Sequence, residues 1–140
     1  MMKYILCLSF LFLAYKTQAQ SFEPGLWTSK ESLELNDIPL PASTDEECIT
    51  LDQAKDAKAT IEKELKKKGC SLTKWIYKNQ KLDAAIKCDN KDMNAVGKLT
   101  GKFSQKSYDL TGEAKGTYKE ILPAVAVLKL SGQWVSFCKK

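Results

Sequence analysis

Apolar and polar residues alternate along the chain after residue 70, with the period of two that is typical of β-strands. Residues 70–77 and 81–88 flank the polar tripeptide Lys78-Asn79-Gln80, so we expect a hairpin centred on Asn79. The register that follows pairs Leu72 with Ile86, Ile76 with Leu82, and Cys70 with Cys88. One face of this hairpin is therefore predicted to be apolar.

A second hairpin is predicted around the loop of residues 104–107, with Phe103 opposite Tyr108. On one face, charged residues of opposite sign then lie across from one another, Lys102 from Asp109 and Lys98 from Glu113. The other face is apolar and contains several glycines: Gly97, Leu99, Gly101, Phe103, Tyr108, Leu110, Gly112, Ala114, Gly116 and Tyr118. Glycines on the inner face of a strand mark bends or the close approach of a ring, so we expect a strongly curved sheet.

Two further strands are expected near the ends of the domain. The first covers about residues 26–35, with Trp27, Leu33 and Leu35 on one face, and the prolines of residues 36–41 indicate a loop after it. The last covers residues 125–138 and carries on one face Ala126, Leu128, Leu130, Gly132 and Trp134. Val125 and Val127 on its other face indicate that the start of this strand is covered on both sides.

One helix is predicted over residues 51–68. Thr50 and Gln53 have the spacing of a capping box, and a weak apolar stripe follows them. Lysines in the last turn and then Gly69 are typical of a helix end. A short extended piece, residues 47–49, precedes the helix. Together these elements predict a mainly β domain, a curved antiparallel meander or small up-and-down barrel or half-barrel of six to seven strands with one inserted helix.

The first nineteen residues have the pattern of a secretory signal peptide. Met1-Met2-Lys3 is a short positive start, residues 4–15 are almost continuously apolar, and Thr17-Gln18-Ala19 provides small residues for cleavage. The apolar stretch is too short to span a membrane, and no other run is long enough, so we expect no transmembrane segment in the mature chain. The remaining residues, 20–140, have the length of one domain.

Export makes disulfides the expected state of the cysteines that remain after the signal peptide. The predicted hairpin register favours a bond between Cys70 and Cys88. By elimination Cys48 pairs with Cys138, which joins the end of the chain to the entrance of the helix. We therefore predict two disulfides.

All 22 basic residues are lysines, and the chain contains neither histidine nor arginine. Without histidine, the commonest general base near neutral pH and the commonest metal ligand are both missing. Without arginine, specific recognition of nucleic acid is not expected. The polar turn at residues 89–94 lacks the acidic spacing of a calcium loop, so we expect no metal and no cofactor.

Several motifs of the mature chain occur together in one known family. They are Pro24-Gly25-Leu26-Trp27, Cys48-Ile49-Thr50 before a helix, Cys70, Cys88, the Gly-rich hairpin with Tyr108, and Gly132-Gln133-Trp134 ending at Cys138. In this combination the chain resembles the bacterial exported family filed as domain of unknown function 3617, over nearly the whole mature length. It departs from the usual pattern in having Trp134 where a basic residue is common, and in the lysines after Cys138. The resemblance implies an envelope protein of Gram-negative bacteria, without an established activity.

Three functions are compatible with these features. The first is a non-catalytic periplasmic binding or structural accessory module whose curved apolar face holds a hydrophobic small molecule or covers an envelope protein. That face is formed by Trp27, Leu99, Phe103, Tyr108, Leu110, Tyr118, Leu128, Leu130 and Trp134. In a domain of this size we favour the simpler interpretation that these residues fill the core. A cavity of about 300 Å³ or more would instead indicate a ligand.

The second function is a secreted interaction or inhibitor-like module that presents the proline-rich segment of residues 36–44. The third is an enzyme, for which the densest acidic group is Asp45-Glu46-Glu47. Because nothing in the sequence places a nucleophile beside a base, we do not expect an enzyme. We expect a periplasmic location, with secretion outside the cell as the alternative.

Overall fold

The structure, a computed structural model, describes residues 21–67 and 69–140 of the chain. Within these residues the strands are β1 (Gly25–Leu35), β2 (Ile38–Pro39), β3 (Ser43–Ile49), β4 (Cys70–Lys78), β5 (Lys81–Asp89), β6 (Met93–Phe103), β7 (Ser107–Tyr118) and β8 (Leu122–Ser136). Two helices, α1 (Leu51–Ala54) and α2 (Ala57–Lys67), lie between β3 and β4 in the sequence. The predicted signal peptide falls outside the described residues.

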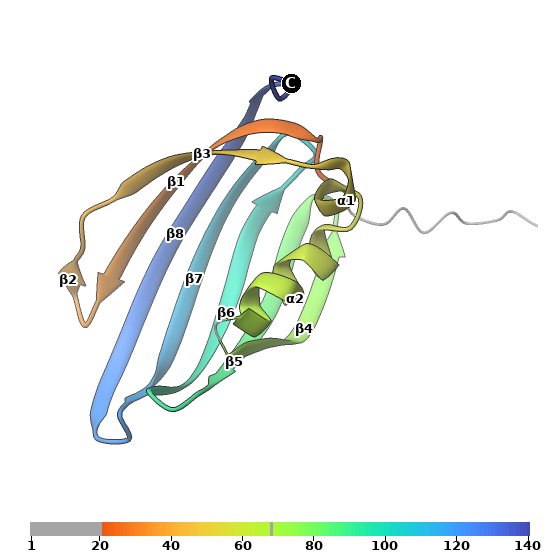
Figure 1. Cartoon of the computed structure of the whole chain (residues 1–140). Helices are drawn as coiled ribbons and strands as arrows, with labels where there is room; N and C mark the ends of the chain where they lie inside the picture. The colour runs from red at the N-terminus through yellow and green to blue at the C-terminus, as the bar shows by residue number, and fades with distance from the viewer. Residues whose placement is uncertain (1–20, 68) are drawn as a thin grey trace, which may run out of the picture.

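All eight strands belong to one antiparallel sheet with the order β2-β1-β8-β7-β6-β5-β4, and β3 also pairs with β1. The sheet is strongly curved and does not close into a barrel (Figure 1). One edge is β4, and β2 and β3 together form the other. The prediction of a mainly β, half-barrel architecture is confirmed, with eight strands in place of six or seven.

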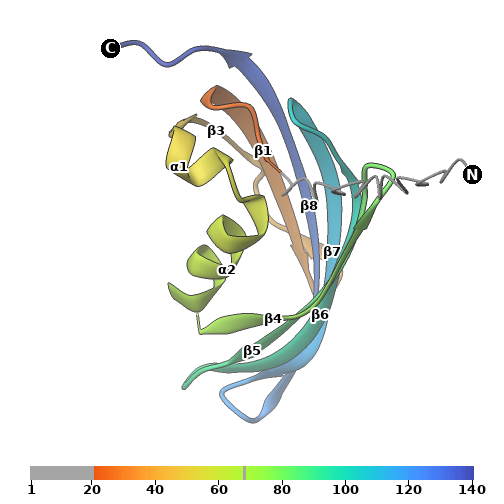
Figure 2. The same ribbon diagram turned by 90° about the vertical axis from the view of Figure 1, so that its right-hand side faces the viewer.

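The helices connect the two edges of the open sheet. The chain leaves β3 at one edge, passes through α1 and α2, and enters β4 at the other edge. Both helices lie on the concave side of the sheet (Figure 2). We call residues 51–67, which cross this side, the helical strap. Ala57 at the start of α2 is fully buried and packs in the core with Leu82 and Ala84.

The second predicted hairpin is confirmed along its length, from Phe103 opposite Tyr108 to Lys98 opposite Glu113. In the first hairpin Leu72 lies opposite Ile86 as predicted, but the pairing of Ile76 with Leu82 was wrong. A β-bulge after Leu72 shifts the register by one residue, so that Ile76 lies opposite Asp83. The extra residue shifts the phase of the alternation, so that Trp75 and Tyr77 follow Leu72 on the concave face. The sequence pattern did not reveal this shift because Ile76, which the bulge places on the exposed convex face, is itself apolar.

The single helix predicted over residues 51–68 is broken into two. The capping box at Thr50 and Gln53 is present and begins α1. The carboxylate of Asp56 then accepts a hydrogen bond from the backbone N–H of Ala59 at 3.0 Å, which starts a second helix. The break turns the chain, and Thr60 secures it by donating to the carbonyl of Gln53 at 2.7 Å.

Residues 36–44 do not form the long loop that was predicted. Asn36 and Asp37, with φ of 50° and 65°, make a tight turn that returns the chain along β1 as β2 and β3. The backbone N–H of Leu40 also donates to the carbonyl of Leu33, which holds the segment between these strands against β1. Asparagine and aspartate tolerate this left-handed conformation better than other non-glycine residues, and two-residue turns of this kind fit the twist of a hairpin.

The final strand β8 begins before Pro123 and ends at Ser136, so Cys138 lies beyond it. The expectation that its start is covered on both sides was wrong, because Val125 is 44% exposed on the convex side. Both disulfides are confirmed. One joins Cys48 at the end of β3 to Cys138 in the C-terminal tail, and the other joins Cys70 and Cys88 across β4 and β5.

Two disulfides are typical of a chain that folds in an oxidising, exported environment. Among the described residues, neither helix has the length and apolar character that crossing a membrane requires.

Candidate functional site

A cavity of about 550 Å³ lies on the concave side of the sheet, between β-strands and the helical strap. It is open to solvent on one side. Its walls come from β1, β3, β5, β6, β7, β8 and α2. A volume of this size falls within the range of small-molecule sites, roughly 300–1,000 Å³.

Aromatic rings close one end of the cavity. Phe22 packs edge to face on both Trp27 and Phe103, with ring centroids 5.4 and 4.7 Å apart, and Tyr108 stacks on Trp27 at 6.0 Å. Their polar atoms are paired, since the Trp27 indole donates to the carbonyl of Glu23 and the Tyr108 hydroxyl donates to Ser29. We call Phe22, Trp27, Phe103 and Tyr108 the aromatic end.

The floor of the cavity is formed by aliphatic residues and glycines of the concave face. Leu99, Leu110, Leu128 and Leu130 lie between the aromatic end and the alanines further along the sheet. Gly97 lies opposite Ala114 and Gly112 opposite Leu99, and both glycines line the cavity. A Cβ at Gly112 would meet only ordinary contacts, whereas one at Gly97 would lie 2.9 Å from the backbone oxygen of Glu113, so close packing of β6 and β7 requires Gly97.

The roof of the cavity is the apolar stripe of α2. Ile61 and Leu65 follow Ala57 at intervals of four residues, so all three lie on one side of the helix. Ala57 anchors the helix in the core, and Ile61 and Leu65 extend the roof over the cavity. The short, irregular strap thus contributes only aliphatic groups to this wall.

Most of the apolar face predicted from the sequence lies around this cavity. Seven of its residues line the cavity: Trp27, Leu99, Phe103, Tyr108, Leu110, Leu128 and Leu130. Tyr118 lies at the far end of β7, 44% exposed, and does not line it. Trp134 lies opposite Trp27 in the paired strands β1 and β8 but does not line the cavity. Its indole donates to the carbonyl of Pro24 and its ring packs on Phe137.

The sequence analysis missed several lining residues. Phe22 precedes the first strand, and only its contact with Trp27 and Phe103 reveals its place. Ile61 and Leu65 were assigned to a weak helical stripe, without any indication of what this stripe covers. The apolar alternation of β1 and β5 could have indicated Leu33 and Ile86, because both continue the concave face.

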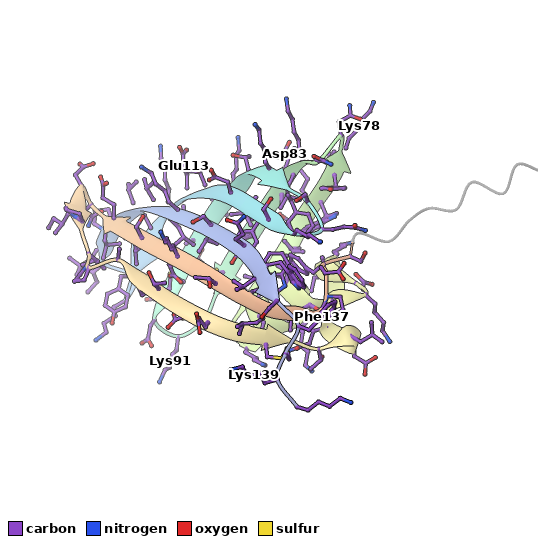
Figure 3. The ribbon with its side chains drawn as sticks, turned by 90° about the horizontal axis from the view of Figure 1, so that it is seen from above. Lys78, Asp83, Lys91, Glu113, Phe137 and Lys139 are labelled. Atoms are coloured by element: carbon purple, nitrogen blue, oxygen red, sulfur yellow. A yellow bond between two sulfur atoms is a disulfide. The ribbon has the colours of Figure 1, made fainter. Side chains whose placement is uncertain are left out.

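Charge is divided between the two faces of the sheet. Lysines in the strands occupy convex positions, as the pairs Lys98 with Glu113 and Lys102 with Asp109 illustrate. Figure 3 shows Glu113 and Asp83 pointing away from the sheet on its convex side. Lys98 and Glu113 therefore border the cavity beside Gly97 and Gly112 without directing their side chains into it.

The concave face carries carboxylates on β1 and β3. Glu31 lies on the same face of β1 as Trp27, and Glu47 of β3 lies directly opposite Trp27. Both line the cavity and are exposed to solvent. In the described part of the chain, no group of three or more His, Cys, Asp or Glu side chains is arranged to hold a metal ion.

Comparison with known families gives one match. The model described as "Protein of unknown function (DUF3617)" matches residues 22–138, which is most of the chain. No curated protein and no solved structure matches the sequence or the fold. The resemblance drawn from the motifs is therefore confirmed at the level of the family.

Proposed function

Because the chain belongs to the DUF3617 family, which has no assigned activity, we propose a function from the cavity itself: a non-catalytic carrier or binding module for an apolar small molecule. The observation that supports it most strongly is the 550 Å³ apolar space between the sheet and the helical strap. Interiors of proteins are packed to nearly crystalline density, so a domain of this size rarely keeps such a space without using it.

The position of the cavity relative to the packed core favours a ligand-binding site over the interpretation that the apolar face only fills the core. The packed core is formed by Ala57, Leu82, Ala84, Leu99, Phe103 and Leu110, and the last three of these also form part of the cavity wall. The other residues of that wall include Leu33, Ala126 and Leu128, which face the same side and are only half-buried. A ligand in the cavity would cover these side chains and complete their burial.

The composition of the walls favours binding over catalysis. Apolar side chains dominate them, and the chain has no histidine to act as a general base near neutral pH. We place the module in the periplasm of a Gram-negative cell, because the predicted signal peptide and the disulfides agree with export. In the periplasm a small binding module meets the apolar molecules of the cell envelope.

Titration with N-phenyl-1-naphthylamine, an uncharged dye whose fluorescence rises in apolar surroundings, tests the proposal. The oxidised protein is expected to bind it saturably with one site per chain. Gly112→Leu should weaken binding of the dye at least about tenfold, because the leucine side chain extends into the cavity. The protein accommodates this residue, since a Cβ at Gly112 meets only ordinary contacts, the nearest 3.4 Å away at Leu128.

Thr111→Leu is the matched control. It adds the same side chain one residue earlier on β7, on the convex face, and should leave the dissociation constant within about twofold. Absence of saturable binding to the wild-type protein would refute the proposal. Equal effects of the two substitutions would show that the dye binds elsewhere.

A further inference from the structure

We propose that the ligand of this cavity is an amphiphile with a positively charged head group, which lies along the carboxylates of β1 and β3. This inference rests on the proposed function and names the chemical class of its ligand. It follows from the charges that border the apolar cavity.

Three carboxylates form one row on the concave face. Glu47 lies opposite Trp27, Asp45 opposite Ser29, and Glu31 opposite Ser43, all in the paired strands β1 and β3. Neighbours on one face of a sheet are roughly 7 Å apart, whether along a strand or on the diagonal between two strands. The row therefore runs for about 13 Å beside the cavity, and we call it the acidic margin.

The same face carries no compensating lysine. In the described strands every lysine occupies a convex register position, although the chain has 22 lysines and a formal net charge of +5. The concave positions alternate with these and hold apolar residues, glycine, serine and the three carboxylates. The charge on the concave face of the sheet is thus opposite in sign to that of the whole chain.

Carboxylates of the acidic margin have no ion pair with the described residues. In the described part of the chain, ion pairs join residues of the helical strap to each other, or Lys74 to Asp83 on the convex side. Glu31 and Glu47 line the cavity, so a molecule that fills it lies next to both. An anionic head group would be repelled there, and a cationic one would supply the missing partner.

The acidic margin also fixes the orientation of the ligand. Trp27 and Phe103 of the aromatic end are buried, whereas Glu31 and Glu47, which also line the cavity, are exposed to solvent. An apolar tail beneath Ile61 and Leu65 leaves the head group beside these carboxylates, in contact with water as well. Partial exposure of these carboxylates limits the gain to that of solvent-exposed ion pairs.

Three decyl probes that differ in their head group test the inference: decyltrimethylammonium, uncharged decyl maltoside and decyl sulfate, each below its micelle concentration. Displacement of N-phenyl-1-naphthylamine gives their dissociation constants. One exposed ion pair changes affinity by up to about fivefold, so two carboxylates should favour the ammonium over the sulfate by about tenfold or more at low salt. The preference should shrink at 0.5 M NaCl, where screening is strong.

The double substitution Glu31→Gln and Glu47→Gln should reduce the preference to less than about threefold while decyl maltoside binds as before. The matched control, Glu34→Gln with Glu46→Gln, changes the net charge equally on the same two strands but on the convex face, and should preserve the preference. Circular dichroism verifies that both variants are folded.

Each outcome has a distinct meaning. If the three probes bind equally, or the sulfate binds best, the charged head group is refuted and the apolar site remains. If both double variants lose the preference to the same extent, the effect comes from net charge and the acidic margin is refuted. If no probe displaces the dye and the dye itself does not bind, the proposed function fails with it.

Discussion

Substitution of Ala114 by leucine distinguishes an empty apolar cavity from a packed core, because the change in the free energy of unfolding has opposite signs in the two cases. Ala114 is half-buried on the concave face, lines the cavity, and has the small residues Gly97 and Ala126 as its cross-strand neighbours. Leucine at this position adds three carbon atoms. They would enter the cavity without meeting a large side chain on either neighbouring strand.

The size of the effect follows from the area that these atoms bury. Full burial of three methylene-sized groups is worth about 2.4 kcal/mol, at about 0.8 kcal/mol for each. Because the cavity is open on one side, we expect about half of this, a gain of about 1 kcal/mol in the free energy of unfolding. Overpacking of a closed core has the opposite sign and costs about 1–3 kcal/mol.

Ala84→Leu provides the matched comparison. Ala84 lies on the concave face of β5, is fully buried in the packed core and does not line the cavity. The same chemical change there should destabilise the protein by about 1–3 kcal/mol. Urea unfolding followed by far-ultraviolet circular dichroism, with the disulfides intact, measures both variants. If Ala114→Leu is as destabilising as Ala84→Leu, the space above Ala114 is filled by the protein itself and the reasoning is refuted.

Three further predictions concern the framework of the fold. Replacement of both Cys48 and Cys138 by serine opens a loop of 90 residues. In the chain-entropy model this should lower the free energy of unfolding, measured with urea, by roughly 4–5 kcal/mol, and a loss below about 1 kcal/mol would contradict the prediction. Glu120→Gly should raise the melting temperature, because Glu120 has φ of 62° and a non-glycine residue in this left-handed conformation costs about 1–2 kcal/mol. The greater chain entropy of glycine in the unfolded state offsets part of this gain. An unchanged or lower melting temperature would contradict the prediction. Gly132→Ala should lower the melting temperature and change the near-ultraviolet circular dichroism, because the ring of Tyr108 lies directly against Gly132; a spectrum identical to that of the wild-type protein would show that the ring tolerates the methyl group.

The strand alternation was sufficient to predict most of the sheet. Opposite charges across β6 and β7 fixed their register, and this pairing was confirmed residue by residue. The signals that failed were local. Asp56, inside a continuous helical pattern, acts as a second cap, and the bulge after Leu72 places the apolar Ile76 on the exposed convex face.

The site was less predictable than the sheet for a physical reason. Alternation assigns a residue to one face but does not determine whether that face is packed or open. The size of the cavity depends on how far α2 lies from the sheet, and this follows from the break at Asp56 and from the anchoring of Ala57. The sequence analysis considered Glu47 only within the acidic group Asp45-Glu46-Glu47 and did not single out Glu31. Only the pairing of β1 with β3 brings Glu31 and Glu47 together beside the cavity.

The most direct test of ligand binding is the position of a tail inside the half-barrel. Crystals of the oxidised protein grown with 12-bromododecan-1-ol, which has an uncharged head group, would locate the bromine by its anomalous scattering. We predict a peak within the cavity, between α2 and the concave face near Gly97 and Gly112. A bromine peak only on the convex face, or a cavity whose walls have collapsed onto one another, would contradict the account.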